Sequence, residues 1–171
     1  LSPKGSEKAV AFYESVLEFD PRPDLPRGNG VWDLGSAEAA EMAKLAETTY
    51  RDVNIALANQ FALHAEEVGV DIQKVIQACN SQPFSHIHTP GISVGGHCIP
   101  VYPHLYLATD RRSGVVAPAR KLNSTVHRWV IEKLLSHFGE QPRPSVLILG
   151  VSYRAGVKET AFSGALSIRD E

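Results

Sequence analysis

The stretch SAEAAEMAKLAETTYRDVNIALANQFALHAEEV, residues 36–68, contains no glycine and no proline over 33 residues. Ser36 is a favourable N-cap residue, and Glu38 and Glu41 follow it where negative charge suits the positive end of a helix. Gly69 supplies a C-terminal stop. At 1.5 Å per residue, such a helix would be about 50 Å long. The stretch therefore predicts one very long helix as the main element of a mainly α fold.

This expected helix is apolar on two sides. One stripe consists of Met42, Leu45, Val53, Ala56 and Leu63, and another of Leu57, Phe61 and Ala65. A helix with two apolar faces packs on both of them. We therefore expect it at the centre of a domain or at a subunit interface.

Shorter elements are expected on both sides of this helix. Apolar periodicity predicts further helices over 6–19 with Ser6 as N-cap, over 71–79, from near Pro103, and over 117–138. Residues 20–30 are an exposed loop rich in Pro, Gly and Asp, and residues 31–34 form a short extended candidate. Residues 145–151, SVLILGV, are a run of β-formers that predicts a buried strand at the start of an α/β domain.

The composition limits the class of protein. The chain has 171 residues, 43% of them apolar and 21% charged, with a formal net charge of −2. This balance is typical of a globular protein and offers no basic surface for nucleic acid. No apolar run approaches the length of a membrane span, and no signal peptide is recognisable. Two cysteines without such a signal favour a reducing, cytoplasmic setting over a disulfide scaffold.

Cys98 is the candidate reactive residue. It lies in an irregular segment, residues 80–100, whose prolines and glycines predict a long loop, and such loops in compact domains are usually functional. Gly95 and Gly96 allow a close approach of the backbone to a ligand. A helix start expected near 102–103 would place the thiol close to a positive helix end, which favours the nucleophilic thiolate. The residues alone leave open that Cys98 is a small buried apolar side chain.

The sequence gives less support to two other kinds of site, a zinc site and a hydrolase dyad. His86, His88, His97 and Cys98 could be considered as zinc ligands, but they lack the usual paired spacing, so no metal site is expected. A hydrolase dyad of His97 and Cys98 is disfavoured because neighbouring side chains diverge.

Lys44 lies on the expected long helix, one turn after Glu41 and one turn before Thr48. It could form an exposed pair with Glu41. Alternatively, Lys44 and Thr48 could face the Cys98 loop, where the ammonium would hold an oxyanion. Spacing does not decide between these positions. The sequence contains no G-x-G-x-x-G, so any dinucleotide site is expected outside this chain.

Four segments together resemble the UDP-glucose/GDP-mannose dehydrogenase family, in the right order and spacing. Residues 39–59 look like its central helix and residues 90–100, PGISVGGHCIP, like its catalytic cysteine loop. Residues 119–123, ARKLN, and 147–154, LILGVSYR, look like later landmarks. The closest similarity is to the UDP-N-acetylmannosamine dehydrogenase type.

The resemblance implies a domain organisation. Residues 1–35 would be the C-terminal remnant of an NAD-binding Rossmann domain, and residues 36–140 a helical central domain that forms a homodimer through its long helix. Residues 144–171 would open a UDP-sugar-binding α/β domain. Partial α/β pieces would thus flank the helical centre. The first residue is Leu1 and the only methionine is Met42, so we expect a piece of a longer protein.

The resemblance also implies a reaction and residue roles. The sugar C6 is oxidised twice with two NAD⁺, through an aldehyde, a thiohemiacetal and a thioester that water hydrolyses to the uronic acid. Cys98 matches the nucleophile, and Lys44 the lysine that stabilises the oxyanion. Substrate-binding positions match Thr48, Gly95, Gly96 and Arg154, of which Arg154 replaces a lysine.

Three departures from the family pattern stand out. Thr48 replaces an asparagine, and Ala161-Phe162 replaces an Arg-Glu pair. Tyr102 replaces an aspartate that helps to activate water. A phenol, with an ordinary pKa of about 10, is a poor base at neutral pH, so thioester hydrolysis is the weakest step. The departures fit a divergent subgroup with another substrate, and they also fit a partial loss of activity.

The sequence thus predicts a fragment of an NAD-dependent nucleotide-sugar 6-dehydrogenase that is inactive by itself because it lacks the NAD site. The alternative is a non-catalytic dimerisation module of a divergent family member. Thiol reactivity distinguishes the two, because an activated Cys98 should alkylate faster than Cys79 near neutral pH.

Overall fold

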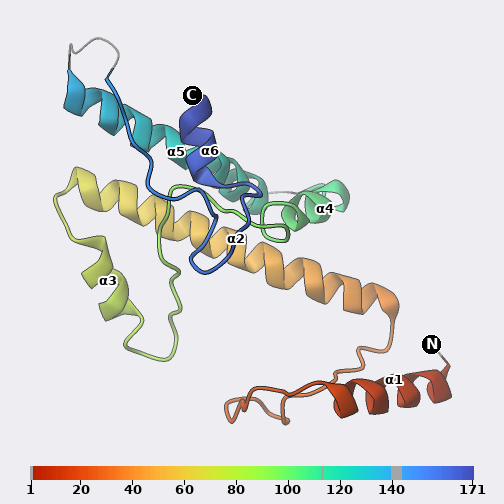
Figure 1. The fold of residues 1–171 in the computed structure, drawn as a ribbon. Helices are drawn as coiled ribbons and strands as arrows, with labels where there is room; N and C mark the ends of the chain where they lie inside the picture. The colour runs from red at the N-terminus through yellow and green to blue at the C-terminus, as the bar shows by residue number, and fades with distance from the viewer. Residues whose placement is uncertain (1, 113, 140–143) are drawn as a thin grey trace. The chain divides into compact units, whose positions relative to one another are not determined.

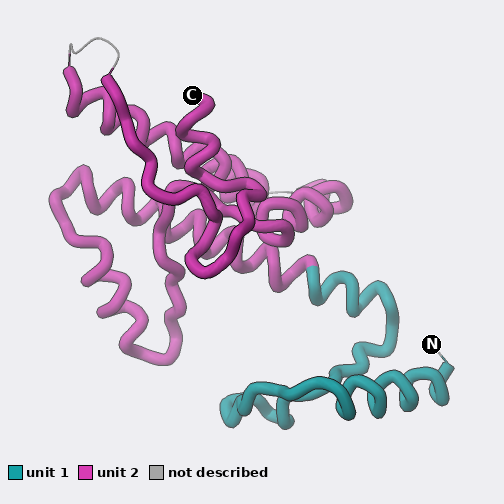
Figure 2. Tube along the Cα trace, in the orientation of Figure 1, with its two compact units in different colours: residues 1–44 teal, residues 45–171 magenta. Residues whose placement is uncertain are grey.

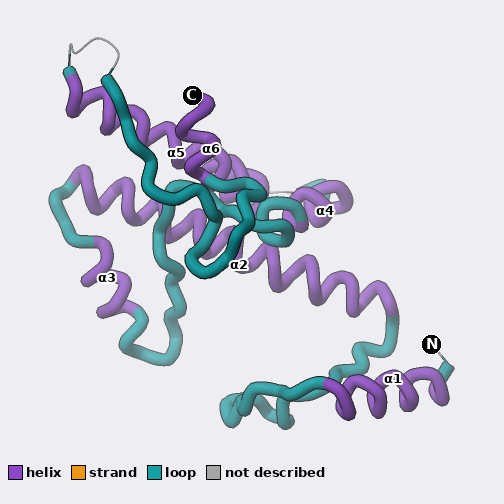
Figure 3. Tube along the Cα trace, in the orientation of Figure 1, coloured by secondary structure: helices purple, strands orange, loops and turns teal. Residues whose placement is uncertain are grey.

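The computed structural model describes residues 2–112, 114–139 and 144–171, and within these residues the chain is mainly helical. The helices are α1 (Pro3–Val16), α2 (Ala37–Glu67), α3 (Ile72–Cys79), α4 (Tyr102–Thr109), α5 (Val116–Phe138) and α6 (Gly164–Asp170) (Figure 1). The part of the chain that the model describes contains no strand (Figure 3). The prediction of a mainly α protein is therefore confirmed, and the expected α/β pieces are not visible as sheets.

The chain divides into two compact units, residues 1–44 and residues 45–171 (Figure 2). In the first unit, α1 begins earlier than predicted, because Ser2 caps it by accepting a hydrogen bond from Gly5 N, and Pro3 follows at the first helical position. The prediction of Ser6 as N-cap was wrong. The Ser6 hydroxyl instead donates to Asp33, so residues 31–34 are held against α1 without forming a strand.

The ends of α2 follow the predicted signals. Ser36 Oγ accepts a hydrogen bond from Ala39 N at 3.1 Å, which caps the N-terminus. Gly69 has φ +71°, the left-handed conformation that ends a helix and that glycine adopts without steric cost. The helix between these residues has 31 residues, and α5, with 23 residues, is the second long helix. In the second unit, α4 and α6 both contact α5 (Figure 1).

The buried side of α2 is polar where an apolar stripe was predicted. Its buried residues are Thr48, Thr49, Asp52, Ala56, Ala58, Asn59 and Ala65. From the predicted second stripe, Ala65 is buried, but Leu57 and Phe61 are exposed. The reason lies on α5, which places polar partners opposite this side of α2.

Asp52 of α2 and Arg120 of α5 form a buried ion pair. Arg120 Nη1 lies 2.7 Å from Asp52 Oδ1, and their side chains are 8% and 0% exposed, respectively. Asn123 of α5 donates to the Asp52 backbone carbonyl and to Oδ1, both at 2.8 Å. Burial raises the pKa of the Asp52 carboxyl, while Arg120 and the Asn123 amide oppose that shift. The two long helices are thus joined by an ion pair that is shielded from water.

The predicted buried strand at 145–151 was wrong for this chain. The segment is irregular, and Leu147 and Leu149 are 83% and 88% exposed. A strand needs a neighbour to pair its backbone groups, and none is present among the described residues. Conversely, α6 was not predicted, because its seven residues carry too short a pattern to reveal a helix.

Replacing Arg120 by Met should lower the free energy of unfolding by about 3–5 kcal/mol, because it leaves the Asp52 carboxylate buried without its partner. Arg22→Met is the control. It breaks an exposed pair with Asp24 of 2.6 Å and should leave stability almost unchanged. Urea unfolding measures both effects. Equal effects of the two substitutions would show that the Asp52–Arg120 pair does not support the fold.

Candidate active site

The first half of the segment that carries Cys98 is held by asparagine side chains. Asn80 Nδ2 donates to Ile87 O at 2.9 Å, and Asn80 Oδ1 accepts from Ile87 N at 2.8 Å. Asn54 of α2 acts in the same way, donating to His86 O at 2.7 Å and accepting from His88 N at 3.0 Å. These amides supply the backbone partners that an irregular chain lacks, so the loop follows a defined path across α2.

The second half of the loop is held by the buried polar cluster. Asn59 donates from Nδ2 to Asn123 Oδ1 at 2.9 Å, and its own Oδ1 accepts from Gly91 N at 2.9 Å. Arg120 Nη1 also donates to Ile99 O at 3.5 Å, next to Cys98. The cluster around the Asp52–Arg120 pair therefore contacts the loop on both sides of the Gly95-Gly96 turn.

Cys98 lies four residues before Tyr102, the first residue of α4. Cys98 is half-buried, and its carbonyl accepts hydrogen bonds from Val101 N at 3.1 Å and Tyr102 N at 2.9 Å. The predicted helix start is confirmed, because α4 begins at Tyr102. The half-buried Tyr102 side chain thus lies at the first position of that helix, four residues after the thiol.

The two predicted site residues on α2, Lys44 and Thr48, lie in different units. Lys44 is exposed and belongs to the first unit, whereas Cys98 belongs to the second. Thr48 lies in the second unit and is wholly buried, and its hydroxyl donates to Leu45 O at 3.2 Å. Thr48 is therefore part of the polar side of α2.

Gly95 and Gly96 are covered by the chain near the C-terminus. A Cβ at Gly95 would lie 2.3 Å from Tyr153 Cβ, and Gly96, at φ +94°, lies under the Tyr153 ring. Gly96 N donates to Ala161 O at 2.8 Å. Arg154, the next residue after Tyr153, is exposed. The structure thus places Tyr153, the residue before Arg154, against the loop that carries Cys98.

Sequence reasoning missed several residues that hold this region. Tyr153 fills the space left by the two glycines, and Glu159 Oε2 lies 3.1 Å from His97 Nε2. Both residues are far from Cys98 in sequence, so no local pattern reveals them. Among the described residues, no three His, Cys, Asp or Glu side chains are arranged to hold a metal ion.

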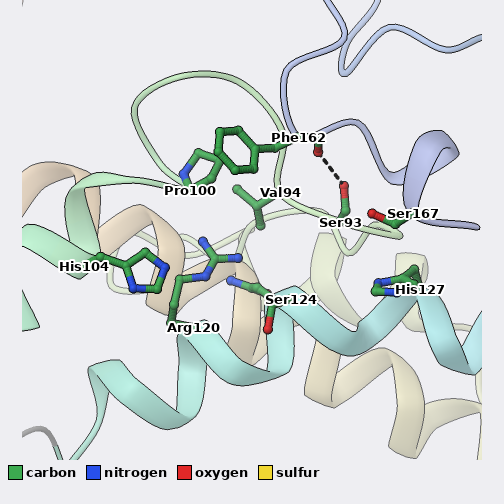
Figure 4. Close-up of a pocket in the computed structure, with 10 residues that line it drawn as sticks. Ser93, Val94, Pro100, His104, Arg120, Ser124, His127, Phe162 and Ser167 are labelled. Carbon is green, nitrogen blue, oxygen red and sulfur yellow. Dashed lines mark hydrogen bonds between the residues drawn. The ribbon is translucent and has the colours of Figure 1, made fainter. Parts of the chain in front are cut away.

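A pocket of about 200 Å³ lies beneath the loop (Figure 4). Its walls include Ser93, Val94 and Pro100 from the loop, His104 from α4, and Arg120 and His127 from α5. Figure 4 shows the Arg120 guanidinium pointing toward the loop from below. The lining includes neither Cys98 nor Arg154.

Comparison with known proteins identifies the group to which the chain belongs. A family model described as the UDP-glucose/GDP-mannose dehydrogenase family, central domain, matches residues 38–127. The chain belongs to the UDP-glucose/GDP-mannose dehydrogenase family. The family resemblance of the sequence motifs is thereby confirmed.

Relatives of the same family support this placement. UDP-N-acetyl-D-mannosamine dehydrogenases from Pyrococcus horikoshii and Methanocaldococcus jannaschii are each 41% identical, over 78% and 95% of this chain. The match covers 33% and 35% of those relatives, so the chain spans about a third of their length. An NDP-N-acetyl-D-galactosaminuronic acid dehydrogenase from Ralstonia nicotianae is 31% identical over 98% of this chain and 37% of its own length.

Solved structures agree. The UDP-D-ManNAc dehydrogenase from Pyrococcus horikoshii aligns with a TM-score of 0.73 and 39% identity, over 79% of this chain and 34% of that one. The UDP-N-acetyl-mannosamine dehydrogenase from Staphylococcus aureus aligns with a TM-score of 0.68 and 32% identity, over 79% and 31%. None of the described helices is long and apolar enough to cross a membrane.

The contact between Gly95 and Tyr153 predicts a steric effect in this family member. Gly95→Ala should destabilise the protein by about 1–3 kcal/mol, because the new methyl group overlaps Tyr153 Cβ. Gly91→Ala, in the same loop, is the control, since its Cβ would have ordinary contacts of 3.9 Å. Thermal unfolding compares the two variants. Unchanged stability of Gly95→Ala would contradict the packing of Tyr153 on this turn.

Proposed function

We propose that the protein is an NAD-dependent nucleotide-sugar 6-dehydrogenase that oxidises a UDP-sugar to the uronic acid through a thioester on Cys98. The observation that carries this proposal is the position of Cys98, half-buried between the Gly95-Gly96 turn and the start of α4 at Tyr102, in a chain of this family. The position and the family motif together support the assignment of Cys98 as the attacking sulfur.

The chain's residues would then act in sequence on the sugar C6. After the alcohol has lost a hydride and its hydroxyl proton, the Cys98 thiolate adds to the aldehyde carbon, and Lys44 stabilises the resulting oxyanion. Loss of a second hydride leaves a thioester. Water attacks the thioester carbonyl, the C–S bond breaks, and the carboxylate leaves while the thiol is restored. Among the predicted substrate-binding residues, the exposed Arg154 would contact the substrate directly, whereas Thr48 is wholly buried and Gly95 and Gly96 are covered by Tyr153, so these three would act by shaping the site.

The hydride acceptor would be NAD⁺, bound mainly by a domain outside this chain. The described residues contain no strand and the sequence has no G-x-G-x-x-G, so these residues do not themselves make a dinucleotide site. The relatives are about three times as long as the matched part. We therefore assign residues 1–35 to the end of an NAD-binding domain, 36–140 to the central domain, and 144–171 to the opening of a sugar-binding domain.

A UDP-N-acetylhexosamine is the substrate class that the relatives favour. Two of them are named as UDP-N-acetyl-D-mannosamine dehydrogenases, and another is named as an NDP-N-acetyl-D-galactosaminuronic acid dehydrogenase. Arg154 offers a guanidinium that binds phosphate in bidentate fashion, where the family has a lysine. Because Gly96 N already donates to Ala161 O, the loop would contact the sugar through its other backbone groups.

A second copy of the chain would pack on the exposed side of α2. Tyr50, Leu57 and Phe61 are exposed large side chains at spacings of seven and four residues, which places them on one side of the helix. Exposed apolar side chains in a row are typical of an interface. We propose a homodimer through this side of α2.

The complete protein should reduce two NAD⁺ for each UDP-N-acetylmannosamine consumed, because both oxidations take place on one sugar. Cys98→Ser should abolish uronate formation, and the 171-residue chain alone should reduce no NAD⁺. Absorbance of NADH at substrate-limiting concentration gives the ratio. A ratio of one NADH per sugar would contradict the thioester route. Reduction of NAD⁺ by the isolated chain would show that the NAD site lies within this chain.

Tyr102 should make thioester hydrolysis the slow step, because a phenol is a poor base for water at neutral pH. Tyr102→Asp should therefore raise the steady-state rate in the complete protein, whereas Tyr102→Asn, which has a similar size but no carboxylate, should not. Rapid-mixing measurement of an NADH burst followed by a slower phase separates hydrolysis from the oxidations. Equal steady-state rates of the two variants would show that hydrolysis does not wait for a base at this position.

A further inference from the structure

The chain from Tyr153 to Gly164 is attached to the Cys98 loop at several points. Gly96 N donates to Ala161 O at 2.8 Å, and Ser93 Oγ donates to Phe162 O at 3.3 Å (Figure 4). A Cβ at Gly164 would lie 2.8 Å from Ser93 Oγ, so only glycine fits there. These contacts bring a segment more than fifty residues away in sequence against the residues just before Cys98.

Glu159 is the side chain that organises this segment. Its Oε1 accepts hydrogen bonds from Thr160 N at 2.8 Å and Ala161 N at 2.9 Å, which shapes the turn that presents Ala161 O to Gly96. Its Oε2 lies 3.1 Å from Nε2 of His97, the neighbour of Cys98. Its backbone carbonyl accepts from Tyr153 N at 3.1 Å, which closes the loop that carries Arg154. One residue thus contacts both halves of the proposed substrate site.

The charge of Glu159 is present at neutral pH. The hydrogen bond to His97, and then those from Ala161 N and Thr160 N, hold the pKa of the Glu159 carboxyl below its ordinary value. A lowered carboxyl pKa means that these interactions are complete above the ordinary pKa and are lost as the pH falls through the lowered one. The contact with His97 is therefore intact where a dehydrogenase would work.

The backbone is strained three residues after Glu159. Phe162 has φ +54°, a conformation that a bulky side chain rarely adopts. Such a conformation persists only where the surroundings impose it, and it is frequent at functional sites. The carbonyl of Phe162 accepts the hydrogen bond from Ser93 Oγ, so the strained residue is one of the points at which the segment contacts the loop.

We propose that Glu159 is a positioning residue that aligns the Cys98 thiol with Arg154, and this role rests on the proposed dehydrogenase function. Through His97 and Gly96 it fixes the backbone that precedes the nucleophile, and through Tyr153 it fixes the backbone that precedes Arg154. The substrate carbon and the diphosphate would be held by these two elements. A displacement of about 1 Å between reacting groups can lower the rate about a hundredfold. A carboxylate that keeps the two elements aligned therefore has a large effect on the rate.

The test uses the complete protein and the variant Glu159→Gln. Glutamine can still accept from Thr160 N and Ala161 N, but it removes the negative charge beside His97. Glu132→Gln, an exposed glutamate on α5, is the matched control. We expect kcat for UDP-N-acetylmannosamine to fall about 10- to 100-fold in Glu159→Gln with KM changed less than about threefold, because alignment rather than binding is lost. Glu159→Asp should recover part of the rate.

A second readout is alkylation of the two cysteines by iodoacetamide, followed by peptide mass spectrometry. In Glu159→Gln the loop should open more often, so Cys98 should react faster while Cys79 keeps its wild-type rate. Unchanged kcat and unchanged Cys98 alkylation would overturn the proposal. Equal acceleration at both cysteines would also overturn it, because it indicates general destabilisation. If the wild-type protein oxidises no UDP-sugar, the proposed function fails, and the ratio of the two alkylation rates still decides whether Glu159 holds the loop.

Discussion

The buried pair of Asp52 and Arg120 is the interaction on which the rest of the second unit depends. Removing a carboxylate and a guanidinium from water is costly, and their attraction compensates only when further hydrogen bonds complete the site. Asn123 supplies two of these bonds to Asp52, and Asn59 in turn donates to Asn123. Asp52 Oδ2 is buried without a hydrogen-bond partner among the described residues, which agrees with the raised pKa of this carboxyl.

A polar core of this kind specifies geometry more strictly than an apolar one. Leu and Val side chains tolerate small shifts between two helices, whereas hydrogen bonds fail when donor and acceptor separate by a fraction of an ångström. The cluster on α2 and α5 therefore defines how these helices meet. Two members of the cluster also bind the loop. Asn59 Oδ1 accepts a hydrogen bond from Gly91 N, and Arg120 Nη1 donates one to Ile99 O. The backbone around Cys98 is thus held by two sets of contacts. One comes from this cluster, and the other comes from the segment around Glu159.

The sequence predicted those features that depend on neighbouring residues. Ser36 and Gly69 marked the ends of α2, and the prolines and glycines of residues 80–100 marked the irregular loop before α4, because caps and turns are determined locally. The polar side of α2 was missed, since the burial of Asp52 and Asn59 is explained only by their partners Arg120 and Asn123 on α5. Glu159 was missed for the same reason, as its partner His97 lies 62 residues away. The run at 145–151 was taken for a buried strand because its composition suits one, but a strand also needs a partner.

The central claim is that this polar framework presents Cys98 as the nucleophile of a nucleotide-sugar dehydrogenase. The most direct measurement is mass spectrometry of peptides from the complete protein, quenched in acid during turnover of UDP-N-acetylmannosamine with NAD⁺. We predict a peptide that contains Cys98 and is heavier by the mass of the nucleotide uronic acid minus one water, with Cys79 unmodified. Turnover to the uronic acid without any adduct on Cys98, when thioesters are preserved by the quench, would contradict the account.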